Sequence, residues 1–118
     1  MSRLLVIDNG VESDAFRWYL QAKEVDLEVV KDAAAGFQEA VNSLPRTVIV
    51  SSAFGIDYIE RLVKAIRSTA NGRSSRVIAL IDSGDSAESL GADAIIMRPF
   101  HLEQVYQVIR DQDHKLTC

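Results

Sequence analysis

Short apolar runs alternate along the chain with longer segments in which apolar residues recur every three or four positions. The runs are four to six residues long and are bounded by turn or charged residues, as is typical of buried strands. One of them, residues 25–30, alternates apolar with acidic residues, which is typical of an edge strand. The pattern predicts five strands, over residues 4–7, 25–30, 47–50, 77–81 and 94–97.

The segments between these runs have the spacing of amphipathic helices. Apolar residues three and four positions apart predict helices over 12–24 and 34–44, a third helix that ends before a turn at Asn71, and a last one through 102–109. Only a short helix fits between residues 83 and 91. Five strands alternating with five helices predict a doubly wound α/β fold, because parallel strands need crossovers that cover both faces of the sheet.

The composition fits one domain. A chain of 118 residues with 47% hydrophobic residues can bury a single core, which we expect within residues 1–112, with 113–118 as a tail or the start of a linker. The net charge is −4 and the basic residues are scattered, so we expect no direct contact with nucleic acid. No apolar run approaches the roughly 20 residues of a membrane span. The only cysteine is Cys118, so a cytoplasmic location without membrane contact is the natural expectation.

Polar residues follow the predicted strands at the edge where open α/β sheets bind their ligands. They are Asp8, Asn9, Ser51, Ser52, Asp82 and Arg98. This set contains no nucleophile paired with a base, and the acidic first loop, "DNGVESDAF", has no glycine-rich phosphate-binding pattern. Neither His101 nor His114 has a second ligand at metal-binding spacing. We therefore expect no catalytic residue, no metal and no cofactor, and the chain is predicted not to be an enzyme.

Three motifs, in this order, resemble the receiver domains of two-component response regulators. "LLVIDNG" stands where that family has an apolar strand followed by paired acids, and "FGIDYIE" stands where it has "PGMDGIE". "GADAIIMRPF" stands where the family typically has "GADDYLVKPF". The resemblance covers essentially the whole chain. It implies a flavodoxin-like five-stranded sheet with the strand order 2-1-3-4-5 and five helices, the fourth of them short.

The resemblance also implies a phosphorylation site that this chain has largely lost. In the family, an aspartate after the third strand takes a phosphoryl group, an acidic pair holds Mg²⁺, and a hydroxyl and a lysine contact the phosphoryl group. Asp8 fills the first acidic position, and the second acid, the acceptor, the hydroxyl and the lysine are replaced by Asn9, Ser51, Ile81 and Arg98. A count backward from "FGID" would put Val50 at the acceptor position instead of Ser51. Neither residue is an aspartate, so the resemblance implies an atypical receiver, or pseudo-receiver.

Some of these side chains also have a purely structural interpretation. Ser51 and Ser52 could accept a phosphoryl group or bind a ligand, but small hydroxyls after a strand more commonly cap the next turn. Asp8 and Arg98 could form a residual anion or metal site, but an ion pair between them is favoured. Asp82 could be a relocated metal ligand, but an exposed loop carboxylate is favoured.

The resemblance implies a regulatory domain in signal transduction or a phosphorelay that acts through protein contacts and without phosphorylation. The expected partner is another protein or a second copy, bound at the face of the fourth helix, fifth strand and last helix, where Ile95, His101 and Tyr106 lie. Trp18, off the apolar line of the first helix, is expected to be partly exposed. Two alternatives stay open: a nucleotide sensor that uses the old acidic pocket, and the N-terminal domain of a DNA-binding regulator.

Overall fold

The computed structural model describes the backbone of residues 4–10, 12–69, 75–82 and 90–117, and side chains as far as residue 111. Its strands are β1 (Leu4–Ile7), β2 (Leu27–Val30), β3 (Thr47–Ser51), β4 (Arg76–Asp82) and β5 (Ala94–Arg98). Its helices are α1 (Ser13–Ala22), α2 (Ala33–Ser43), α3 (Ile56–Arg67) and α4 (Leu102–Thr117), with a 3₁₀ turn over Ser52–Phe54. All five predicted strands are therefore confirmed, each within two residues of its predicted start.

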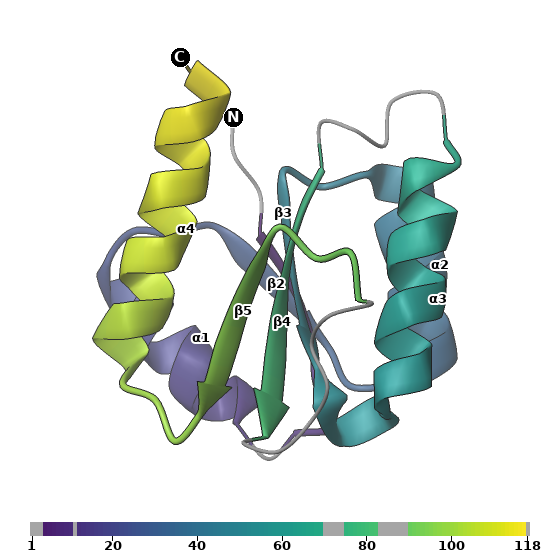
Figure 1. Ribbon diagram of the computed structural model, residues 1–118. Helices are drawn as coiled ribbons and strands as arrows, with labels where there is room; N and C mark the ends of the chain where they lie inside the picture. The colour runs from purple at the N-terminus through teal and green to yellow at the C-terminus, as the bar shows by residue number, and fades with distance from the viewer. Residues whose placement is uncertain (1–3, 11, 70–74, 83–89, 118) are drawn as a thin grey trace.

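The five strands form one parallel sheet in the order β2-β1-β3-β4-β5, which confirms the order that the resemblance to receiver domains implies. Figure 1 shows α1 and α4 on one face of the sheet and α2 and α3 on the other. The strand order reverses between β1 and β3, because the chain first runs from β1 to one edge and then returns to the other side. In such sheets the reversal point, at the carboxyl ends of the strands, is where ligands bind.

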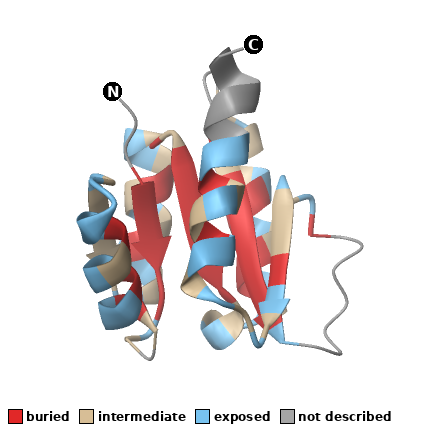
Figure 2. Ribbon diagram, turned by 90° about the vertical axis from the view of Figure 1, so that its left-hand side faces the viewer, coloured by how far each residue is buried: buried red, intermediate tan, exposed pale blue. Residues whose placement is uncertain are grey.

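Successive side chains of the central strands pack alternately into two separate apolar cores, one on each face of the sheet. On β1, Leu5 and Ile7 pack under α2 and α3, whereas Leu4 and Val6 pack under α1 and α4. Figure 2 shows the consequence, with buried strands between helices whose outer surfaces are exposed. Because both faces of these strands are covered, their sequences are continuous apolar runs.

Local sequence explains where helix α2 begins and ends. The side chain of Asp32 accepts a hydrogen bond from the backbone N–H of Ala35 at 2.8 Å, which satisfies one of the free donors of the first turn. At the other end Leu44 has a φ of 44°, and Pro45 follows, so the helix cannot continue.

Two predicted segments differ from the structure or lie outside it. The short helix expected between 83 and 91 falls mostly on residues that the structure does not describe, so four α-helices are seen in the described chain. The last helix is longer than predicted, because α4 continues to Thr117 through most of the segment expected to be a tail. Within the described residues, no helix is both long and apolar enough to cross a membrane.

Candidate functional site

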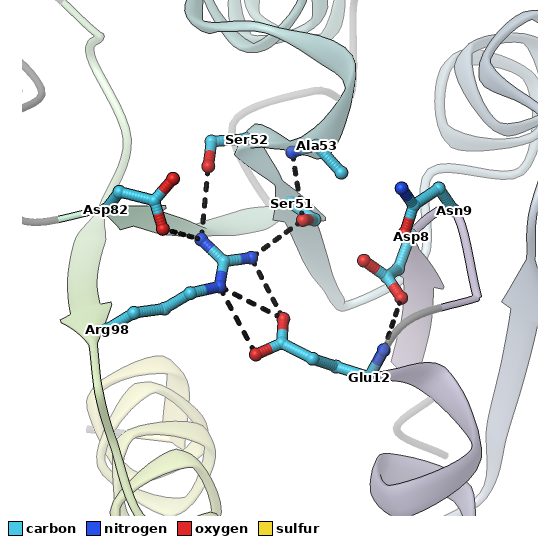
Figure 3. A pocket seen from close by; sticks show the side chains of 8 residues that line it. All are labelled: Asp8, Asn9, Glu12, Ser51, Ser52, Ala53, Asp82 and Arg98. Carbon is cyan, nitrogen blue, oxygen red and sulfur yellow. Dashed lines mark hydrogen bonds and ion pairs between the residues drawn. The ribbon is translucent and has the colours of Figure 1, made fainter.

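A polar pocket lies at the carboxyl ends of β1, β3, β4 and β5. The parallel register pairs Ile7 with Val50, and Asp82 with Arg98, so that the residues at or just after these strand ends meet at one edge. The pocket has a volume of about 240 Å³. Figure 3 shows the side chains that line it, which are Asp8, Asn9, Glu12, Ser51, Ser52, Ala53, Asp82 and Arg98.

The guanidinium of Arg98 occupies the middle of this pocket, and all three of its nitrogens donate hydrogen bonds (Figure 3). Nε lies 3.2 Å from both carboxylate oxygens of Glu12, and Nη2 lies 2.9 Å from one of them. Nη2 also donates to Ser51 Oγ at 2.9 Å, and Nη1 donates to Ser52 Oγ at 3.1 Å. The remaining acceptors of Nη1, both at 3.3 Å, are the carbonyl oxygen of Leu80 and Asp82 Oδ1.

Arg98 is charged, as arginines in proteins are, and its contacts stabilise the charged form. Burial by itself would lower the pKa of Arg98, but hydrogen bonds and charge attraction from Glu12, reinforced by Asp82, outweigh it and raise the pKa above its usual value. The guanidinium is thus a permanent internal cation, held between two carboxylates.

The predicted ion pair between Asp8 and Arg98 is wrong. The side chain of Asp8 is buried, and its Oδ2 accepts hydrogen bonds from the backbone N–H groups of Gly10 and Glu12, each at 3.1 Å. The loop after β1 therefore folds around Asp8, while Arg98 pairs with Glu12 at 2.9 Å and with Asp82 at 3.3 Å. Asp8 Oδ1 has no hydrogen-bond partner in the described part of the chain.

Ser51 has the capping role that the sequence favoured, whereas the side chain of Ser52 contacts Arg98 instead. Ser51 Oγ accepts a hydrogen bond from the backbone N–H of Ala53 at 3.1 Å and so caps the 3₁₀ turn that follows β3. Ser51 lines the pocket, whereas Val50 is fully buried in the core under α2 and α3. Of the two residues that the sequence left open for the acceptor position, only Ser51 faces the pocket.

Four of the five positions carried over from the receiver motifs line the pocket, namely Asp8, Asn9, Ser51 and Arg98. Ile81 does not, since it is fully buried in the core under α2 and α3, and the next residue, Asp82, lines the pocket instead. Asp82 is exposed, as expected, but its carboxylate is also ion-paired.

The residues of the expected interaction face lie around β5. Ile95 packs against the core under α2 and α3, whereas Tyr106 packs against the core under α1 and α4. His101 is exposed, and its carbonyl oxygen accepts the first hydrogen bonds of α4. These three residues therefore lie on both sides of the sheet edge. Trp18 is 74% exposed, as predicted.

Sequence reasoning missed Glu12. This residue directly precedes α1, and its side chain crosses the pocket to Arg98, 86 positions away in the sequence. The only sequence signal is an acid in the first loop just before a helix, which a helix terminus alone would explain. Glu12 and Asp82 together restore two carboxylates to an edge at which the motifs had left only Asp8.

Comparisons with family models and with curated proteins found no match, but solved structures do match. The chemotaxis response regulator CheY4 of Vibrio cholerae is 16% identical, with a TM-score of 0.80 over 95% of this chain and 98% of that one. The receiver domain of the sensor histidine kinase PA1611 of Pseudomonas aeruginosa is 17% identical, with a TM-score of 0.80 over 94% and 96%. The fold is that of a receiver domain. NtrX of Brucella abortus, at 18% identity and a TM-score of 0.75, matches 99% of this chain over 28% of its own, so the same fold also occurs within a longer protein.

The PA1611 receiver domain holds a magnesium ion in its active-site cleft, and the residues of this chain do not fit such an ion. Mg²⁺ requires oxygen ligands in near-octahedral geometry, usually including carboxylates. Here Asn9 is neutral, and Glu12 and Asp82 are engaged by Arg98. The described residues contain no group of three or more acidic, histidine or cysteine side chains that could hold a metal ion.

Proposed function

We propose that this chain is a receiver-like regulatory domain that acts in signal transduction through protein contacts, without aspartyl phosphorylation and without enzymatic activity. The observation that carries the proposal is the placement of Arg98. Its guanidinium lines the pocket at the carboxyl edge of a receiver fold and is held there by Glu12, Ser51 and Ser52.

The chemistry of the pocket supports the absence of phosphotransfer. The residue at the end of β3 is Ser51, whose hydroxyl cannot form an acyl phosphate and already accepts hydrogen bonds from Arg98 and Ala53. A phosphoryl group entering the pocket would also meet three carboxylates, from Asp8, Glu12 and Asp82. Repulsion between like charges opposes its binding.

The same charges weigh against the nucleotide-sensor alternative, because nucleotide phosphates are anionic. We instead assign the regulatory contact to the surface around β5, which is an edge strand. On it Met97 is 48% exposed. Tyr106 packs against the core under α1 and α4, below the charged groups of Lys23 and Arg110. An edge strand that carries an exposed apolar side chain offers a partner both unpaired backbone groups and apolar surface.

The test is a titration of the ¹⁵N-labelled chain with beryllofluoride and Mg²⁺, followed by backbone amide chemical shifts. A receiver domain that retains its aspartate serves as the positive control. We expect no change at Ser51, Ser52 or Gly10. Saturable shifts at these three amides would contradict the proposal.

The contact surface has its own test. Sedimentation of the chain over a range of concentrations reports self-association, and Met97→Asp is expected to abolish any that is observed. Trp18→Asp, which places the same charge on the exposed outer side of α1, is the matched control. Self-association that survives Met97→Asp but not Trp18→Asp would move the contact from β5 to α1.

A further inference from the structure

One buried oxygen in the pocket lacks the hydrogen bond that its position demands. Asp8 is 1% exposed, and its Oδ1 has no partner in the described chain, although its Oδ2 has two. Figure 3 shows this oxygen on the side of the carboxylate that faces Ser51 and Arg98. A buried acceptor without a donor is costly, and such groups in folded proteins are nearly always satisfied.

The charges around this oxygen select a cation. Three carboxylates and one guanidinium line the pocket, which leaves two net negative charges. Arg98 is already bracketed by Glu12 and Asp82, so the charge of Asp8 remains uncompensated by any ion pair in the described residues. A positively charged group that donates a hydrogen bond would both satisfy this oxygen and offset the charge of the pocket.

The size of the pocket and the number of its open acceptors favour a small ammonium group over a metal ion. The pocket of about 240 Å³ is smaller than the roughly 300–1,000 Å³ typical of drug-sized sites, so it takes a small group. A second hollow of about 480 Å³ adjoins it, sharing Glu12, Asp82 and Arg98 and adding the apolar surfaces of Pro99 and Phe100. A divalent ion would need several ligand oxygens, whereas an ammonium carries three N–H donors, one of which can reach Asp8 Oδ1.

We propose that this pocket binds a primary ammonium group at the end of an alkyl chain. The ammonium donates a hydrogen bond to Asp8 Oδ1, and the alkyl chain leaves through the adjoining hollow against Pro99 and Phe100. The same chemistry is presented by a free aliphatic amine and by the lysine side chain of a protein. The inference goes beyond the proposed signalling contact and does not depend on it, since a free amine would bind whether or not a protein partner exists.

The test uses butylammonium chloride at pH 7, where the amine is protonated, with ¹⁵N-labelled protein. We expect saturable shifts of the Gly10 and Glu12 amides, which bond to the other oxygen of Asp8, with a dissociation constant on the order of 1 mM. Tetramethylammonium has the same charge but no N–H group, and it should leave these amides unchanged. Equal shifts with both cations, or no shift with butylammonium, would overturn the proposal.

Two variants separate the site from general electrostatics. Asp8→Asn keeps an oxygen for the two amides but replaces the open acceptor with a donor, and it should weaken butylammonium binding at least about tenfold. Asp14→Asn removes the same charge from an exposed position on α1, where Asp14 pairs with Lys31 at 3.8 Å, and it should leave binding unchanged. An equal loss of butylammonium affinity in both variants would show that binding depends only on surface charge and would overturn the proposed site. Because the two cations are compared on the unaltered chain, the proposal remains testable if Asp8→Asn does not fold.

Further titrations identify the source of the amine and exclude a metal. Binding of 1,4-diaminobutane but not of a Gly-Gly-Lys-Gly-Gly amide would support the site and assign it to a free amine. Binding of the peptide but not of the diamine would support the site and assign it to a lysine side chain. Shifts with MgCl₂ in the absence of any shift with the amines would replace the ammonium site with a metal site. The titration with MgCl₂ alone is also the blank for the beryllofluoride titration, so that metal binding and phosphorylation are distinguished.

Discussion

The ion pair between Arg98 and Glu12 should be the main energetic link across the pocket, and a double-mutant cycle can measure it. The cycle uses Arg98→Met, which keeps the length of the side chain, and Glu12→Gln, which keeps its shape. A second cycle replaces Glu12→Gln by Asp82→Asn. Because all variants share the same fold and pocket, the two coupling energies can be compared directly.

The geometry predicts very different couplings for the two carboxylates. Arg98 and Glu12 share three nitrogen–oxygen contacts of 2.9 to 3.2 Å, with side chains only 23% and 26% exposed. A charge-assisted hydrogen bond contributes about 1.5–3 kcal/mol and an exposed ion pair about 0.2–1 kcal/mol, so a partly buried pair should fall near 1–2 kcal/mol. Asp82 is 66% exposed and makes one contact at 3.3 Å, so its coupling should be about 0–0.5 kcal/mol.

Urea unfolding followed by circular dichroism gives the free energies for both cycles. Adding salt to about 0.5 M should reduce the Asp82 coupling proportionally more than the Glu12 coupling, because exposed charges are screened more strongly. A coupling to Glu12 below about 0.5 kcal/mol, or one smaller than the coupling to Asp82, would refute the view that Glu12 holds the guanidinium in place.

Three further predictions concern the rest of the fold. Burial, with a smaller contribution from Asp32, raises the pKa of Tyr58 to about 12. The protonated hydroxyl therefore stabilises the fold fully below pH 10, and this stabilisation should be lost between about pH 10 and 12. In urea unfolding, the difference in stability between the unaltered chain and Tyr58→Phe should shrink over that range. Gly36→Ala should destabilise the chain by about 1 kcal/mol despite the better helix propensity of alanine, because its Cβ would lie 2.7 Å from the buried Cγ2 of Ile7; a higher melting temperature would contradict this. Trp18 is the only tryptophan and is 74% exposed, so its fluorescence maximum should shift little on unfolding, and a large blue shift in the folded state would show that its side chain is covered.

The sheet could be predicted from the sequence because its central strands are buried on both faces. A run such as 4–7 is apolar and buried at every position, and this pattern is hard to produce in any other way when turn residues follow it. Helix ends were less certain, since they depend on local caps. The predicted end of the last helix was too early because polar residues at 113–117 suggested a tail, although a polar helix that continues from a packed one needs no apolar face of its own.

The sequence predicted where the pocket lies, but it did not predict which charged side chains in it pair with one another. Asp8 and Arg98 were expected to bond because opposite charges at one sheet edge usually do. The structure differs because two backbone N–H groups of the loop after β1 already hold Asp8, while Glu12 reaches Arg98 from the end of α1. The direction of a loop side chain depends on the local backbone course, and a pattern of residue types does not contain it.

The alternation that separates the two cores also makes the pocket sensitive to a shift of a single residue. Ser51 faces the pocket and Val50 faces the core, so moving β3 by one position along its neighbours would exchange a hydroxyl for an isopropyl group at the edge and bury the hydroxyl. The same holds for Ile81 and Asp82 on β4. An insertion or deletion inside either strand would therefore change which side chains line the pocket and would disrupt the core at the same time. A substitution at Ser51 or Asp82, in contrast, can change the chemistry of the pocket and leave the alignment of the strands intact.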